Sequence, residues 1–136
     1  MAPEQAERIA IESDADVVTA RQRARALAVG LDMPTTDQTL LATAISEIAR
    51  NITAYAVRGE VLLDVVQDGA RRGVRVVASD DGPGIDDLEK ALQDGYTTGG
   101  GLGLGLPGAR RLVDDFDIQT APGEGTRVTL VKWTRG

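Results

Sequence analysis

The stretch that decides the fold is a helix near the middle of the chain that carries both a wide apolar stripe and a polar pair. Its central residues read Ser46-Glu47-Ile48-Ala49-Arg50-Asn51-Ile52. The apolar positions recur at helical spacing, and they are Leu40, Leu41, Ala44, Ile45, Ile48, Ala49, Ile52 and Tyr55. A stripe this wide is typical of a helix whose inner face packs on a sheet. The sequence therefore predicts a helix that begins after Thr35 or Thr36 and covers a sheet.

Further elements are predicted on both sides of this helix. A strand or a helical lead-in is expected at 6–11, followed by a helix over 16–31 with Ser13 or Asp14 as its cap. Alternating apolar residues predict strands at 60–67 and 74–79, joined by a turn-rich connection at 68–73. Short helices at 86–92 and 107–115 and a hairpin of strands at 116–120 and 126–132 follow. This order predicts an α/β fold in a single domain over residues 1–136, a two-layer sandwich with helices packed on one face of a mixed, mostly antiparallel sheet.

The composition narrows the class of protein. The 136 residues, of which 42% are hydrophobic and 26% charged, suit one folded domain with one core. A net charge of -6 makes nucleic acid an unfavourable partner. The sequence has no apolar run of membrane-spanning length and no secretory signal at its start. We therefore expect a cytoplasmic protein with neither a membrane nor a nucleic-acid partner.

Two residue types are missing altogether. The sequence contains no cysteine and no histidine. Without cysteine there is no disulfide framework and no thiolate zinc site. Without histidine there is no Ser-His-Asp triad, no histidine metal cluster and no phosphorylation of the chain on its own histidine.

The polar pair on the central helix has the residue types of a catalytic site. Glu47 and Asn51 are one helical turn apart, so they lie on the same helix face at the edge of the apolar stripe. A carboxylate there can accept or orient the proton of a substrate hydroxyl, and an amide oxygen can ligate Mg²⁺. Polar pairs at this spacing are also common on ordinary exposed helices, so the pair alone does not identify a site.

A second motif follows the strand at 74–79, and it reads Asp80-Asp81-Gly82-Pro83-Gly84-Ile85. Asp80 is expected to point from the strand end into a crevice, where its carboxylate can accept the amino group of adenine. Gly82 and Gly84 have no Cβ atom and therefore allow the backbone to approach a flat base. The same residue types also make ordinary tight turns.

The third motif is a glycine-rich run that reads Gly101-Leu102-Gly103-Leu104-Gly105-Leu106-Pro107-Gly108. Glycines at alternate positions let successive backbone N–H groups converge on an anion, and the helix that follows adds its N-terminal dipole. The run lacks the lysine and serine of a P-loop, and no strand ends just before it as in a dinucleotide-binding fold. It predicts a phosphate-binding loop, with residues 94–101 as a lid.

Together the motifs resemble the ATP-binding domain of the GHKL superfamily, which includes gyrase, Hsp90, histidine kinases and MutL. Its N box matches Glu47 and Asn51, and its D-x-G-x-G box matches Asp80, Gly82 and Gly84. Its glycine box matches Gly101, Gly103 and Gly105, and the threonine of its last motif matches Thr126. The resemblance covers nearly the whole chain. Within the superfamily the chain looks most like the small group of anti-sigma factors and switch kinases. This resemblance implies the Bergerat ATP-binding fold.

The resemblance also implies a function. Kinases of this group phosphorylate serine or threonine on STAS-domain partners of the stressosome scaffold and antagonist type, and they activate a PP2C-type phosphatase by binding it. Carried over, Glu47 is the catalytic base, Asn51 binds Mg²⁺, and Asp80 reads adenine with support from Thr126. The phosphates of ATP are held by the loop residues Gly101, Leu102, Gly103, Leu104 and Gly105.

Other functions stay open at this point. A non-catalytic, ATP-dependent anti-sigma factor or a partner-switching binding module would share the same ATP site. Glu47 favours catalysis, because a binder needs Asn51 for Mg²⁺ but does not need the base. Arg50, Arg110 or Arg111 can neutralise charge during transfer. The basic clusters at 21–25 and 71–75 are expected to be solvated surface.

Overall fold

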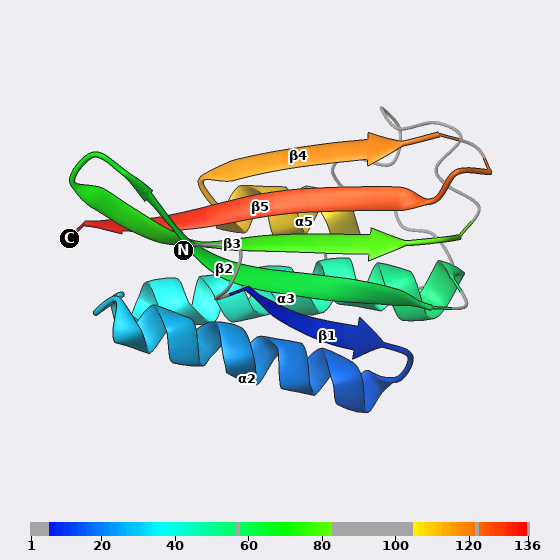
Figure 1. Ribbon diagram of the computed structural model, residues 1–136, viewed down its shortest axis with the longest axis horizontal. Helices are drawn as coiled ribbons and strands as arrows, with labels where there is room; N and C mark the ends of the chain where they lie inside the picture. The colour runs from blue at the N-terminus through cyan, green and yellow to red at the C-terminus, as the bar shows by residue number, and fades with distance from the viewer. Residues whose placement is uncertain (1–5, 57, 83–104, 122, 136) are drawn as a thin grey trace.

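The computed structural model describes residues 6–56, 58–82, 105–121 and 123–135, which form a five-stranded sheet with helices on one face (Figure 1). The strands are β1 (Glu7–Ile11), β2 (Gly59–Asp68), β3 (Arg71–Asp80), β4 (Asp115–Thr120) and β5 (Thr126–Arg135), in the sheet order β1-β2-β3-β5-β4. The helices are α2 (Asp14–Gly30), α3 (Thr35–Tyr55) and α5 (Gly105–Leu112). Every strand pairing within these ranges is antiparallel. The predicted α/β sandwich is confirmed.

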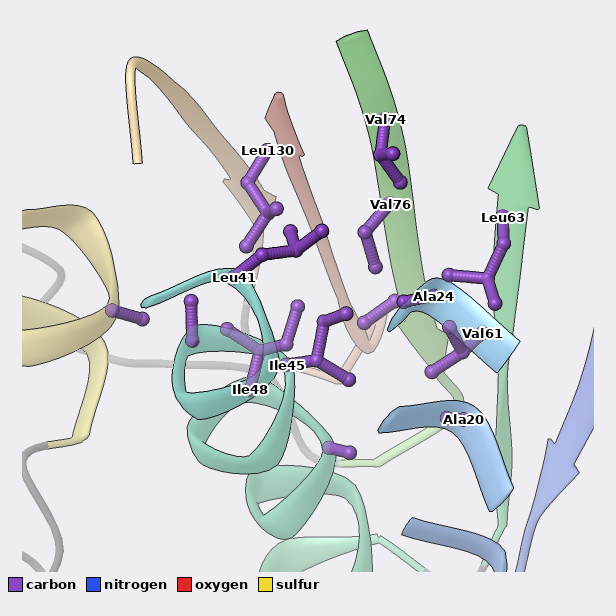
Figure 2. Close-up of a cluster of buried hydrophobic side chains, with 14 of the residues drawn as sticks. Ala20, Ala24, Leu41, Ile45, Ile48, Val61, Leu63, Val74, Val76 and Leu130 are labelled. Atoms are coloured by element: carbon purple, nitrogen blue, oxygen red, sulfur yellow. The ribbon is translucent and has the colours of Figure 1, made fainter. Parts of the chain in front are cut away.

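One core fills the space between the helices and the sheet (Figure 2). Alternate residues of the central strands point toward the helices, and those labelled in Figure 2 are Val61, Leu63, Val74, Val76 and Leu130. From α3, Leu41, Ile45 and Ile48 meet them, each at most 1% exposed. Burying one such side chain contributes about 1.5–3 kcal/mol. The sheet-facing stripe predicted for α3 is thus confirmed, although Leu40 is only half-buried and the side chain of Tyr55 lies outside the described part.

The first residues of the described chain form an edge strand, which decides between the two alternatives for 6–11. Residues 7–11 pair with β2, and Ile9 and Ile11 turn toward the core. The chain then enters α2 at Asp14, with Ser13 as the N-cap residue. No helix in the described ranges has the length and apolar character needed to span a membrane.

Several predicted boundaries are wrong by two or three residues, and the strand expected at 126–132 extends to Arg135. The connection expected at 68–73 is a two-residue turn, because Asp68 and Arg71 are already paired across β2 and β3. The helix expected over 107–115 begins at Gly105 and ends at Leu112. It ends early because the Asp114 N–H donates to Val131 O at 3.1 Å, which joins the chain to the edge of β5. The predicted helix at 86–92 and the lid at 94–101 lie outside the described residues.

The sheet face turned away from the helices carries polar pairs. Arg75 donates from Nε and Nη2 to the two oxygens of the buried Asp64 carboxylate, at 3.0 and 2.6 Å. The Arg71 guanidinium lies 4.0 Å above the Trp133 ring, whose Nε1 donates to Asp115 at 2.7 Å. Arg71 is thus exposed as expected, whereas Arg75 is half-buried and links β2 to β3 through Asp64.

Candidate functional site

Glu47 lies almost buried on α3, at the edge of the core. The residue is 8% exposed, yet its side chain lines an open pocket of about 360 Å³ between α2 and α3. Arg50, one turn later on α3, donates from Nη1 to Glu47 Oε2 at 3.3 Å. Because the Glu47 side chain lines the pocket, a hydroxyl group that enters the pocket can reach the carboxylate.

Asn51 and Asp80 lie toward the same end of the sandwich. Asn51 is half-buried and precedes Ile52, where the end of α3 meets the end of β3 (Figure 1). A Cβ atom built on Gly59 would lie 2.8 Å from Ile52 Cγ2 and 3.1 Å from Asp80 Cβ, so the two element ends pack tightly around this glycine. The fold thus brings together residues of two motifs that are separated by a strand hairpin in the sequence.

The Asp80 carboxylate is held by backbone groups. The Gly82 N–H donates to Asp80 Oδ1 at 2.8 Å, and the Thr126 N–H, across the β3–β5 register, donates to the same carboxyl group. Burial raises the pKa of the Asp80 carboxyl above its ordinary value of 3.8, and the charge of Asp81 adds to this, whereas the two hydrogen bonds oppose it. An acceptor in a partly desolvated position suits an uncharged N–H donor such as the amino group of adenine.

Gly125 lets β5 begin directly against Asp80. Its φ is +78°, in the left-handed region that favours glycine, and a Cβ atom on it would overlap the carbonyl oxygen of Asp80. Gly123, two residues earlier, has a similar φ of +80° but open space around the position of a Cβ atom. The two glycines therefore separate the effect of the backbone conformation from the effect of close packing on Asp80.

We predict that Gly125→Ala lowers the free energy of unfolding by at least about 2 kcal/mol, through left-handed strain of about 1–2 kcal/mol and overpacking of about 1–3 kcal/mol. Urea denaturation measures this loss. Gly123→Ala is the matched control, and it should lose only the conformational part. Equal losses in the two variants would contradict the packing role of Gly125.

The predicted phosphate loop leads into α5. Gly105 is the first residue of this helix, and Leu106 and Ala109 of the same helix are buried in the core against α3. Since α5 starts two residues earlier than predicted, its N-terminus lies within the glycine-rich run, which suits an anion. The remaining predicted residues of these motifs lie outside the described part, and they are Gly84, Gly101, Leu102, Gly103 and Leu104.

The described side chains that could ligate a metal suit Mg²⁺ bound together with a nucleotide better than a metal ion held by protein ligands alone. The described residues include no group of three or more acidic, histidine or cysteine side chains that could hold an ion. Mg²⁺ in nucleotide sites keeps several waters and binds substrate phosphates, with only one or two protein ligands. A single amide oxygen such as that of Asn51 fits this mode.

The pocket beside Glu47 is rich in arginine, which reasoning from the sequence missed. Arg21 and Arg25 of α2 line it together with Arg50 of α3. Arg21 Nη1 donates to Ser46 Oγ at 3.3 Å, so the expectation of a plain solvated surface is wrong for this half-buried residue. The spacing of Arg21 and Arg25 does indicate that they share a helix face. Which residues that face contacts is determined by the packing of α2 on α3.

The other two arginines considered for charge neutralisation lie away from this pocket. Arg110 and Arg111 are exposed residues in the last turn of α5. Neither lines the pocket beside Glu47, whereas Arg50 does. Of the three candidates, Arg50 is the one that the fold brings to the proposed base.

A comparison with known families decides the classification of this site. The family model described as histidine kinase-, DNA gyrase B- and HSP90-like ATPase matches residues 36–135, a range that contains Glu47, Asn51, Asp80 and Thr126. The chain belongs to this ATPase family. The GHKL resemblance inferred from the three motifs is thereby confirmed.

Relatives place the GHKL chain more finely. It is 45% identical to the serine/threonine-protein kinase RsbT of Bacillus subtilis (strain 168) over 127 residues, which cover 93% of this chain and 96% of that protein. It is 28% identical to the anti-sigma F factor of Thermoanaerobacter sp. (strain X514) over 120 residues, which cover 84% of this chain and 82% of that protein. The GHKL chain is therefore RsbT-like and related to anti-sigma F factors.

A solved structure supports the GHKL fold. The mycobacterial sensor histidine kinase MprB matches with a TM-score of 0.57 and 17% sequence identity, over 95% of this chain and 97% of that one. At this identity the likeness concerns the fold alone.

Proposed function

We propose that the chain is a serine/threonine protein kinase that transfers the γ-phosphoryl group of ATP to STAS-domain partner proteins, of the stressosome scaffold and antagonist type, in a partner-switching pathway. The observation that carries this proposal is the setting of Glu47. Its carboxylate is nearly buried, is paired with Arg50 and lines a pocket that is open to a protein substrate. The 45% identity to a protein named as a serine/threonine kinase supports the same activity.

The transfer requires one proton acceptor and an aligned phosphate chain. The acceptor hydroxyl oxygen of the partner forms a bond to the γ-phosphorus as the bond from that phosphorus to the β,γ-bridging oxygen breaks. Glu47 takes the hydroxyl proton, and ADP leaves with the bridging oxygen. Arg50, whose guanidinium lies 3.3 Å from the Glu47 carboxylate, is placed to orient this base.

Residues at the other end of the site would hold the nucleotide. Asp80 accepts the adenine amino group, and the Gly82 and Thr126 N–H groups keep its carboxylate in place. The glycine run at 101–105 and the N-terminus of α5 bind the phosphates. Asn51 would ligate Mg²⁺, which neutralises phosphate charge when it is bound.

Two further features complete the proposal. The kinase also activates a PP2C-type phosphatase by direct binding, as the likeness to the switch-kinase group implies. It acts in the cytoplasm, where ATP and such partners are available.

A second candidate function is a non-catalytic, ATP-dependent anti-sigma factor or binding module. The similarity to anti-sigma F factors favours it, at 28% identity over 120 residues. Both functions use the same nucleotide site, so the distinction depends on whether the Glu47 carboxylate takes part in phosphate transfer.

The decisive experiment measures transfer of label from γ-labelled ATP, with Mg²⁺, to a purified STAS-domain protein that has an acceptor serine. We expect incorporation that requires this chain and that disappears when the acceptor serine of the partner is replaced by alanine. ATP binding and stable capture of the partner without any transfer would contradict the kinase and support the binding module.

A further inference from the structure

The pocket between α2 and α3 is lined by more positive than negative side chains, although the protein as a whole is acidic. Its lining includes three arginines, Arg21, Arg25 and Arg50, and one carboxylate, that of Glu47. The chain as a whole is acidic, with a net charge of -6. A cationic pocket attracts anionic groups of a binding partner.

Two of these arginines have capacity for a further partner. Within the described residues, Arg21 and Arg25 meet neutral hydroxyl oxygens, Ser46 Oγ at 3.3 Å and Thr39 Oγ1 at 3.4 Å. A guanidinium group has five N–H donors in a fork that matches a carboxylate in two-point contact. Hydroxyl contacts at these distances therefore leave most of the donor capacity of both side chains for an incoming anion.

Apolar side chains flank the same arginines. Among the described residues, Val18 and Val29 are the large hydrophobic residues exposed to solvent, at 38% and 56%. They are about three helical turns apart on α2, with Arg25 between them on the same face. Exposed apolar groups beside charged ones are typical of a surface that binds protein, whereas a small anion would make no use of the valines.

We propose that this surface, formed by Val18, Arg21, Arg25 and Val29 and named here the arginine face, docks an acidic segment of the protein substrate. The proposal rests on the kinase function above. Since the pocket lining also includes Glu47, a segment bound to Arg21 and Arg25 places a neighbouring serine hydroxyl of the partner next to the proposed base. The partner surface that fits has carboxylates and apolar side chains close to its acceptor serine.

The test is a double charge reversal, Arg21→Glu with Arg25→Glu, assayed with the STAS-domain protein of the transfer experiment. We expect the KM for the partner and the dissociation constant of the complex, measured by calorimetry, to rise at least about tenfold. The turnover number at saturating partner and the affinity for ATP should change little. In the wild type, partner affinity should fall as salt rises, and this dependence should weaken in the variant.

A matched control changes the same net charge elsewhere. Arg8→Glu with Arg23→Glu reverses two exposed arginines whose ion-pair partners are Glu60 and Glu7, outside the pocket. Partner binding should stay at the wild-type level. Val29→Asp, a single exposed change on the arginine face, gives a second test if the double variant fails to fold, and it should weaken the partner without lowering ATP affinity.

Each outcome is decisive. An unchanged partner KM and dissociation constant in the folded double variant would overturn the docking role, and so would an equal loss in the control. Lower ATP affinity with intact partner binding would assign the pocket to nucleotide phosphates instead. If the wild type transfers no phosphate, the kinase proposal fails, but loss of calorimetric binding in the double variant would still support docking.

Discussion

Replacing Glu47 by glutamine is expected to lower the turnover number for phosphate transfer by about 10²–10⁴-fold, the usual contribution of a positioned general base. The amide has almost the shape of the carboxylate, and its oxygen can still accept the hydrogen bond from Arg50. It cannot take a proton from the acceptor hydroxyl. Because Asn51 and Asp80 are unchanged, ATP should bind as in the wild type. The measurements are the turnover number with γ-labelled ATP and the ATP dissociation constant by calorimetry.

Two controls separate the base from a general effect of removing charge. Glu7→Gln removes a half-buried carboxylate on β1 that pairs with Arg23, and it should leave transfer unchanged. Glu47→Asp retains a carboxylate on a shorter side chain, and it should recover part of the activity. Wild-type turnover in Glu47→Gln would show that another group takes the proton.

Replacing Asp80 by asparagine is expected to weaken ATP binding by about 10- to 100-fold. In the wild type, Oδ1 accepts the Gly82 N–H at 2.8 Å, and the carboxylate has a second oxygen for adenine. In asparagine, one of these oxygens becomes an NH₂ group, so a donor faces a donor either at Gly82 or at adenine. Leaving such a group unpaired costs about 1–3 kcal/mol, which corresponds to the expected loss of affinity.

The neighbouring carboxylate offers a control for this prediction. Asp81 has a side chain that is 57% exposed and an ion pair with Arg58 at 3.4 Å. Asp81→Asn removes the same charge one residue away, and it should bind ATP within about twofold of the wild type, because exposed ion pairs contribute about 1 kcal/mol or less. Equal losses in both variants would mean that net charge, and not the position of Asp80, determines affinity.

The same Asp80 variant should have the opposite effect on the stability of the ATP-free protein. Burial raises the pKa of Asp80 in the folded state, so the folded state keeps this proton to higher pH than the unfolded chain. As the pH rises above 3.8, the unfolded chain ionises first, and the wild type loses stability relative to Asp80→Asn. The advantage of the variant should be absent below pH 3.8 and complete above the folded-state pKa. Urea denaturation of both proteins across this range measures it, and a difference that does not change with pH would contradict it.

Much of the fold was predictable because its determinants are local. The apolar stripe of α3 follows from the helical repeat, and Leu41, Ile45 and Ile48 are buried as predicted. The positions of the strands were predictable from the alternation of apolar residues, but the residues at which the strands begin and end were not. Arg71 looked like a loop residue, yet it extends β3, because pairing with Asp68 across a two-residue turn satisfies the backbone of both residues.

The candidate site likewise has features that local sequence predicts and features that depend on contacts between distant strands. Glu47 and Asn51 are predictable as a pair because four residues make about one turn of any α-helix. The placement of Asp80 at a strand end was likewise predictable from the sequence. By contrast, the contact between Asp80 and Thr126 follows from the register of β3 with β5, and Thr126 was identified only through the family resemblance.

The sequence by itself therefore determined which chemical groups this protein has and how they are spaced along each helix and strand. Only the tertiary structure decided which groups face one another. Arg21 and Arg25 show the difference most clearly, because α2 could have turned them to solvent. Burial of Ala20 and Ala24 against the core fixes the rotation of α2, and this rotation directs the two arginines toward α3 and Glu47. The physical reason is that long-range packing selects one face of each helix, and no local pattern specifies the partner of the other face.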